Sequence, residues 1–239
     1  MIIIFLLFSL AFAQGENFNL EIEGIPLNIE DWSPFAPWYG GNAYSTPEFA
    51  DIDADSDFDL FIGDGGGNLI YLENIGDIFY PNYSFITFNF DSLNIYGGMT
   101  KLNFVDLDAD GDLDLYITTS YYPNLFINIG TPSSYQFELI EDTLIQNFNI
   151  TSVNFTDIDS DDDYDLFAAD INGDIFLYLN NGTPQIWEYN EPIILIDYPS
   201  YVDWIKVSLC DIDNDNDYDL FFGDDDGEIS YYRNEGDSL

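Results

Sequence analysis

The feature that most constrains this chain is an aspartate-rich stretch of ten residues that occurs four times. The copies run from Asp51 to Leu60, Asp106 to Leu115, Asp157 to Leu166 and Asp211 to Leu220. Each copy has Asp at positions 1, 3, 5, 7 and 9 and Leu at position 10. Five carboxylates within nine residues repel one another, so a folded chain holds them close together only around a cation. Oxygen ligands at alternate positions of a tight loop suit calcium, which takes about 6–8 of them.

Position 12 of each copy decides what kind of calcium loop this is. An EF-hand loop needs a bidentate Glu at position 12 and a helix after it. Position 12 here holds Ile62, Ile117, Ala168 and Phe222, each within an apolar run typical of a strand. The loop must therefore close on the position-9 Asp and lead directly into a β-strand.

The four copies belong to a longer repeat. Their first aspartates stand at 51, 106, 157 and 211, so the units are 55, 51 and 54 residues apart. An Asn-x-Gly turn moves with them, beginning at Asn74, Asn128, Asn180 and Asn234. Within a unit, one short strand enters the loop, a second leaves it, a third follows a Gly- or Asn-rich turn, and a fourth follows the Asn-x-Gly turn. Four short antiparallel strands per unit of about fifty residues describe a blade of an all-β propeller.

These units predict the domain organisation. We expect residues 14–239 to form a single β-propeller domain of four four-stranded blades, arranged as a small ring or an open arc. The sequence stops directly after the third strand of its last unit, and residues 18–29 resemble an isolated outer strand. We therefore expect the N-terminal strand to complete the last blade.

The aspartate stretch and the strand that follows it resemble the FG-GAP/VCBS type of repeat, the calcium-loop blade of integrin-like β-propellers. The resemblance covers nearly the whole chain after residue 13, and it implies one Ca²⁺ per repeat, four in all. It implies side-chain ligands at positions 1, 3, 5 and 9 and a carbonyl ligand at position 7. The family favours Gly at position 6, where only Gly111 matches; Ser56, Asp162 and Asn216 stand there in the other loops.

The predicted metal residues are therefore the five aspartates of each loop, within 51–59, 106–114, 157–165 and 211–219. They are Asp51, Asp53, Asp55, Asp57, Asp59, Asp106, Asp108, Asp110, Asp112, Asp114, Asp157, Asp159, Asp161, Asp163, Asp165, Asp211, Asp213, Asp215, Asp217 and Asp219.

Charge and composition limit the partners. The chain has 46 acidic residues against 3 basic ones, a formal net charge of −43, which excludes nucleic acid and anionic membrane surfaces as natural partners. Residues 1–13 form an apolar run that ends Ala-Phe-Ala, which is typical of a signal peptide, although it has no basic residue. The run is too short to span a bilayer. We expect a secreted or cell-surface protein without direct membrane insertion once the signal is cleaved.

No residue pattern outside the loops predicts catalysis. The chain has no His, and its single cysteine, Cys210, lies in an apolar run and is expected to be buried. The tryptophans are expected mainly to pack between blades, although aromatic rings can also stack on sugars; they are Trp32, Trp38, Trp187 and Trp204.

The sequence therefore predicts a non-enzymatic scaffold for adhesion or for binding a protein or glycan ligand, in which calcium is structural and two copies can form a homodimer. Two alternatives stay open. One is a carbohydrate-active enzyme, such as a polysaccharide lyase or hydrolase, or its accessory module. The other is a fragment of a larger cell-surface protein.

Overall fold

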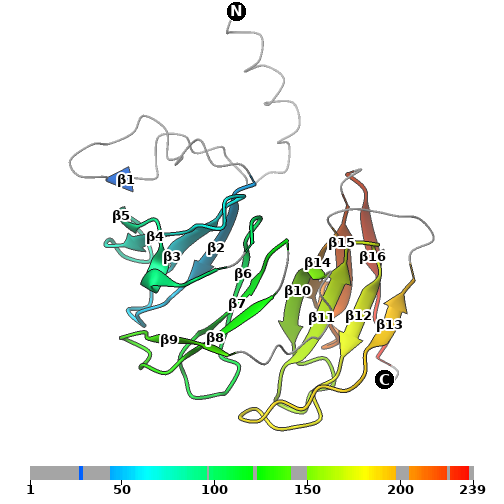
Figure 1. Ribbon diagram of the computed structural model, residues 1–239. Helices are drawn as coiled ribbons and strands as arrows, with labels where there is room; N and C mark the ends of the chain where they lie inside the picture. The colour runs from blue at the N-terminus through cyan, green and yellow to red at the C-terminus, as the bar shows by residue number, and fades with distance from the viewer. Residues whose placement is uncertain are drawn as a thin grey trace, which may run out of the picture.

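The computed structural model describes residues 27–28, 44–95, 97–120, 123–140, 150–197, 205–224 and 227–236. In these residues it is an all-β protein whose antiparallel sheets form the blades of a four-bladed β-propeller (Figure 1). The sequence prediction of the fold class is confirmed. The helical structure described is one turn of 3₁₀-helix, η1 (Phe90–Ser92), and no described helix has the length and hydropathy to cross a membrane. The expected signal peptide, residues 1–13, lies outside the described residues.

Each blade is built from strands consecutive in the chain, with the first strand innermost. The first blade has β2 (Thr46–Ala50), β3 (Asp59–Gly63), β4 (Leu69–Asn74) and β5 (Tyr83–Thr87). The second has β6 (Lys101–Val105), β7 (Asp114–Thr118), β8 (Asn124–Asn128) and β9 (Phe137–Ile140). The third has β10 (Ile150–Thr156), β11 (Asp165–Asp170), β12 (Ile175–Tyr178) and β13 (Ile193–Ile196). The fourth has β14 (Lys206–Cys210), β15 (Asp219–Gly223) and β16 (Ile229–Tyr232).

The N-terminal strand is placed differently from the prediction. In the described residues the fourth sheet has three strands, and β1 (Leu27–Asn28) pairs in parallel with β5 of the first blade. The prediction that residues 18–29 complete the last blade is therefore wrong for these two residues, and the rest of that segment lies outside the described ones. The sequence pattern of residues 18–29 indicates that they can pair with the edge of a sheet. Several blades have such an edge, and the pattern does not indicate which of them is used.

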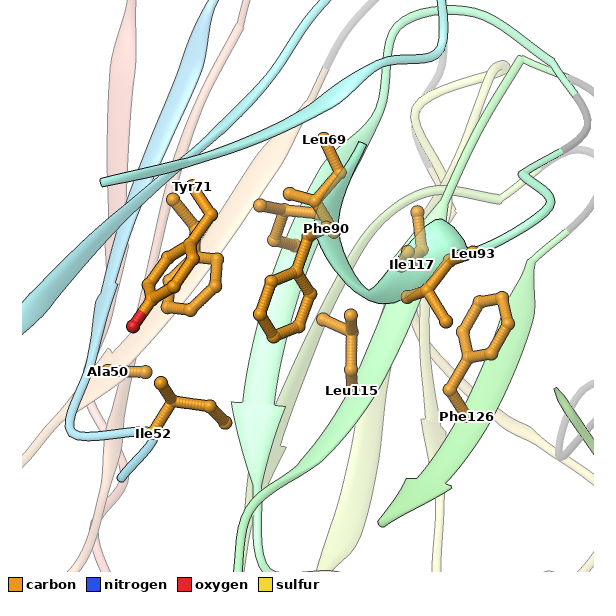
Figure 2. Packing of buried hydrophobic residues seen from close by; sticks show 11 residues of the cluster. Ala50, Ile52, Leu69, Tyr71, Phe90, Leu93, Leu115, Ile117 and Phe126 are labelled. Atoms are coloured by element: carbon orange, nitrogen blue, oxygen red, sulfur yellow. The ribbon is translucent and has the colours of Figure 1, made fainter. Parts of the chain in front are cut away.

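Hydrophobic clusters between successive blades form the core. In the cluster between the first two blades, Tyr71 of β4 and Phe90 lie beside Leu115 and Ile117 of β7 (Figure 2). The ring of Phe61 of β3 packs against those of Tyr71 and Phe90. The second cluster includes Tyr116 and Leu125 from the second blade and Val153 and Leu166 from the third. The third includes Phe167 and Ile175 from the third blade and Val207 and Phe222 from the fourth. Neighbouring blades cover both faces of β7 and β11, which explains why these strands are apolar from the residue after their first Asp as far as Ile117 and Ala169.

This packing runs from the first blade to the fourth without a matching cluster between the fourth and the first in the described residues. The residue just before the loop is buried in the first three blades, at Ala50, Val105 and Thr156. Its equivalent in the fourth blade, Cys210, is exposed. The prediction of a buried thiol is wrong because no described blade covers this face of β14, which also exposes Lys206. The charge of Lys206 on β14 nevertheless acts on Glu48 of β2, so the innermost strands of the fourth and first blades lie within electrostatic range of each other.

Candidate metal centres

All four aspartate loops occupy the same place in their blades. Each connects the innermost strand to the second strand, so that the residue before the loop pairs with the position-9 Asp. Those pairs are Ala50 with Asp59, Val105 with Asp114, Thr156 with Asp165, and Cys210 with Asp219. The loop is therefore the tip of a β-hairpin, and its two ends are fixed by the antiparallel register. The prediction that the loop leads directly into a strand is confirmed.

Backbone N–H groups donate to the aspartate side chains in the same way in every loop. In the second loop, Asp110 N–H donates to Asp106 Oδ1 and Gly111 N–H to Asp106 Oδ2, both at 3.1 Å. Asp112 N–H donates to Asp110 Oδ1, also at 3.1 Å. The same three bonds, at 3.0–3.2 Å, recur in the other loops. The carboxylates at positions 1 and 5 thus wind the backbone into a turn that keeps the alternate side chains together.

The turn requires left-handed backbone at two positions. Position 6 has φ of 77° at Ser56, 97° at Gly111, 73° at Asp162 and 76° at Asn216. The family preference for Gly at position 6 therefore reflects a real backbone requirement, which Asp162 and Asn216 tolerate and Ser56 meets with strain. Position 4 is also left-handed, with φ between 55° and 63° at Ala54, Ala109, Ser160 and Asn214. This second requirement was not predicted, because Ala and Ser give no signal of a left-handed residue.

The position-9 Asp connects the loop to the Asn-x-Gly turn. Oδ1 of Asp114 accepts the N–H of Asn128 at 2.8 Å, and its Oδ2 accepts the N–H of Leu107, position 2 of the loop, at 2.9 Å. The third and fourth loops repeat both bonds at 2.8–3.2 Å. In the first loop Asn74 N–H donates to Asp59 Oδ1, but Oδ2 accepts the Tyr71 hydroxyl instead. The two landmarks that move together in the sequence are therefore in direct contact.

The Asn side chain of the Asn-x-Gly turn also fixes the connection between the third and fourth strands. Oδ1 of Asn128 accepts the N–H groups of Gly130 and Gln136 at 3.1 and 2.8 Å. A Cβ on Gly130 would lie 2.2 Å from the carbonyl oxygen of Ser134, so no larger residue fits there without moving backbone. Bonds and close approaches of the same kind occur in the first and third blades. Turn and aspartate loop form one hydrogen-bonded unit.

In each loop three carboxylates offer oxygens that lie within 4.8 Å of one another. In the first and fourth loops they belong to positions 1, 3 and 5, and in the second and third to positions 1, 3 and 9. These groups are Asp51, Asp53 and Asp55; Asp106, Asp108 and Asp114; Asp157, Asp159 and Asp165; and Asp211, Asp213 and Asp215. The structure thus brings together twelve of the twenty predicted residues as close groups, and it does not place any position-7 carboxylate in them.

The loops contain buried carboxylate oxygens that lack a hydrogen-bond partner, and these test whether the residues fit a cation. Asp108 Oδ1, at position 3 of the second loop, is one of them. At position 7, one oxygen each of Asp57, Asp112 and Asp163 is also buried without a partner. A buried ionised oxygen without a partner is costly, so it requires a cation or a proton. Hard oxygen donors in this arrangement fit Ca²⁺.

The pKa values of the loop carboxylates also indicate that these loops need a positive charge. Burial, as the first cause, raises the pKa of Asp59 and of Asp114 to about 7. It also raises the pKa of Asp112 and of Asp163 to about 6, where the neighbouring loop carboxylates add to the effect. Without a metal, therefore, these loops hold negative charge at a free-energy cost that a bound cation or a proton removes.

Residues 106–168 match the family model of the FG-GAP-like repeat. They contain the second aspartate loop, its Asn-x-Gly turn and the third loop. This segment of the chain is similar to an FG-GAP-like repeat. The first and fourth loops share its backbone hydrogen bonds to the position-1 Asp. No curated protein sequence matches the chain.

Solved structures match the fold at low sequence identity. One is the Tc holotoxin pore of Photorhabdus luminescens with the mutation TccC3-D651A, which matches at 15% identity and a TM-score of 0.47 over 78% of this chain and 9% of its own. Another is BBS1N in complex with ARL6DN, soaked with lead, at 14% identity and a TM-score of 0.47 over 84% of this chain and 54% of its own. The chain thus spans about a tenth and about half of these two proteins.

Proposed function

We propose that this chain is a calcium-stabilised propeller scaffold outside the cell, which binds a protein or glycan ligand. The observation that carries the calcium assignment is the group of close carboxylates at the same place in every blade, together with buried carboxylate oxygens that have no partner. Acidic turns on a surface are ordinarily solvated, whereas these oxygens are removed from water. FG-GAP repeats often bind calcium and are typical of extracellular proteins, where calcium is plentiful.

In this proposal positions 1, 3, 5 and 9 supply side-chain oxygens, and position 7 supplies its carbonyl. Bound calcium supplies the positive charge that offsets the repulsion among the carboxylates. The side chains fix the shape of the loop by hydrogen bonds. Asp106 and its equivalents accept backbone N–H groups inside the loop, and Asp114 and its equivalents accept one from the Asn-x-Gly turn. Each loop fixes the hairpin between the first and second strands, so metal binding stabilises the register of the whole blade.

A cavity between the third and fourth blades supports a ligand-binding role. It has a volume of about 490 Å³, which lies within the range of about 300–1,000 Å³ of small-molecule sites. Its wall has an apolar part, with Phe167, Leu177 and Leu209, and a polar part of similar extent that includes Asp159 and Arg233. Such a surface suits an apolar side chain or a sugar ring. Trp187, the one tryptophan among the described residues, instead packs against the second core cluster and donates to the carbonyl of Leu107 at 2.7 Å.

The alternative, a carbohydrate-active enzyme, would need an acid or base outside the loops. Among the carboxyl and amino groups of the described residues outside the loops, those with a shifted pKa lie on the innermost strands. Burial raises the pKa of Glu48 and, together with Lys206, lowers the pKa of Lys101 to about 8. Lys101 Nζ donates to the carbonyl of Thr151 at 2.5 Å, an interaction that also suits a purely structural role. We therefore propose that the protein is not an enzyme.

A calcium titration tests the proposal. Thermal unfolding and metal stoichiometry are followed together on the purified chain, first in chelator and then with rising Ca²⁺. We expect several ions per chain, up to four, and a large rise in the melting temperature. A glycan array with and without calcium, combined with an assay for new reducing ends, then separates a binder from an enzyme. The absence of any calcium effect would refute the metal assignment, and product formation by the purified protein would refute the scaffold.

A further inference from the structure

The fourth loop contains a cation from the chain itself. Arg233, the only arginine in the sequence, directly follows β16. Its Nη2 lies 2.5 Å from Oδ2 of Asp213 and 3.4 Å from Oδ2 of Asp215. These are positions 3 and 5 of the fourth loop, two of the three carboxylates that come together there. Within its own loop, the guanidinium therefore contacts carboxylates at positions that, in the other loops, are predicted to bind a metal ion.

The other three blades have no cation at this place. The backbone bond from the turn Asn to the position-9 Asp fixes the preceding residue relative to the loop in every blade. That preceding residue is Glu73 in the first blade, Ile127 in the second and Leu179 in the third. Only the fourth blade has a basic residue there, although the whole chain contains just 3 basic residues. The fourth loop thus differs from the others at one defined position.

The carboxylates of the fourth loop differ from those of the other loops in their partners. Each of the first three loops contains a buried carboxylate oxygen without a hydrogen-bond partner, as at Asp57, Asp112 and Asp163. The described residues of the fourth loop contain no such oxygen, and Asp213 and Asp215 there contact the guanidinium. Its need for a metal is correspondingly smaller.

We propose that Arg233 is a built-in cation of the fourth loop, which holds this loop in its metal-binding conformation without metal and competes with Ca²⁺ for Asp213 and Asp215. The inference rests on the proposed function, because it assumes that the other three loops bind calcium. A planar guanidinium with several donors can contact two carboxylates at once, but it carries one unit of charge where Ca²⁺ carries two. Calcium can therefore displace it, at the cost of breaking the ion pairs. The fourth site becomes the weakest of the four.

The test compares calcium binding to the full chain with and without this cation. Isothermal titration with CaCl₂ is carried out on the unmodified chain, on Arg233→Gln, and on Lys206→Gln. The last variant removes the same unit of charge from an exposed side chain of the same blade, outside the loop. We expect the weakest site to bind about three- to tenfold more tightly in Arg233→Gln, because Ca²⁺ then has no ion pair to displace. Lys206→Gln should leave the weakest site as it was.

Two further variants assign the effect. Arg233→Lys keeps the charge and should keep the weak site. Asp211→Asn in the Arg233→Gln background removes a ligand from the fourth loop only, and should abolish the tightened site. In chelator, Arg233→Gln should also melt at a lower temperature than Lys206→Gln, because the fourth loop then has no cation.

The outcomes separate this inference from the proposed function. Calcium binding that is the same in all variants would overturn the inference and leave the calcium scaffold in place. No calcium binding by any of them would refute the scaffold's metal sites, and the melting temperatures in chelator would then show by themselves whether Arg233 stabilises the loop. Equal melting temperatures of Arg233→Gln and Lys206→Gln in chelator would overturn the stabilising part of the inference.

Discussion

The position-9 Asp of the third loop provides the most direct test of how loop and blade are coupled. Asp165 is fully buried. It accepts backbone N–H bonds from Ile158, inside the loop, and from Asn180, in the Asn-x-Gly turn, at 2.9 and 2.8 Å. It also belongs to the group of close carboxylates with Asp157 and Asp159. The substitution Asp165→Asn keeps the size of the side chain but removes its charge and one of its two acceptors.

Two effects of this substitution have separate magnitudes. In chelator, one buried N–H loses its acceptor, which costs about 1–3 kcal/mol, although removing a desolvated carboxylate offsets part of that cost. With calcium, a site with Kd of about 0.1 mM contributes about 2.7 kcal/mol at roughly 10 mM Ca²⁺. For a domain of about 150–250 residues, each kcal/mol corresponds to a shift in melting temperature of about 2–4 °C. Loss of the site should therefore reduce the calcium-dependent rise in melting temperature by about 5–11 °C.

Asp162→Asn is the matched control. Asp162 lies in the same loop and is exposed, and it stands at position 6, which is not a predicted ligand position. The substitution removes the same charge, and Asn tolerates the left-handed conformation that position 6 requires. Calorimetry in chelator and in 10 mM Ca²⁺, with the metal stoichiometry measured in parallel, compares the two variants. If Asp165→Asn keeps the full number of ions and the same calcium-dependent shift as Asp162→Asn, position 9 is not a ligand and the coupling argument fails.

Three further substitutions test other parts of the structure. Ala109→Gly relieves the left-handed backbone at position 4, where φ is 55°, and should raise the free energy of unfolding by about 0.5–1 kcal/mol in a urea titration; a loss of stability would contradict the strain. Gly130→Ala places a Cβ 2.2 Å from the Ser134 carbonyl oxygen and should lower that free energy by more than about 2 kcal/mol, with and without calcium, whereas a near-neutral effect would mean that the turn has room. Burial and Lys206 lower the pKa of Lys101 to about 8, so the unfolded chain binds more protons above that pH and the contribution of Lys101 to stability should increase as the pH rises from 8 towards 10. The melting temperature of the unmodified protein minus that of Lys101→Met should therefore increase over this pH range, and a difference that stays constant would contradict the shifted pKa.

The sequence predicted the fold well because its signals are local and repeated. Asp at alternate positions, an apolar run after position 9, and an Asn-x-Gly turn at a fixed distance recur in four units, so each unit supports the interpretation of the others. The observed second strands begin at the position-9 Asp itself, as expected for a loop that leads directly into a strand. The bond from Asn128 N–H to Asp114 explains why the two landmarks keep their spacing. A repeated hydrogen-bonded unit leaves a repeated sequence pattern.

The features that the sequence missed depend on contacts between distant parts of the chain. Cys210 occupies the same place in its unit as the buried Ala50, and only the lack of a covering blade in the described residues makes it exposed. Pairing of β1 with the first sheet depends on which sheet edge is within reach. The left-handed backbone at position 4 has no compositional signal when Ala occupies it, as at Ala109. Periodicity describes a unit and its register, but not what packs against that unit.

Arg233 shows most clearly how a repeat protein can differentiate its units. The pattern of alternate aspartates is the same in all four loops, so sequence reasoning treated the four sites as equivalent. The salt bridges of Arg233 with Asp213 and Asp215 depend on a residue eighteen to twenty positions later, which the hairpin and the Asn234 turn bring back to the loop. In a blade lacking a fourth strand in the described residues, a cation that does not depend on calcium keeps the loop in shape. In the part of the chain that the structure describes, the blade with three strands is thus also the one whose loop depends least on metal.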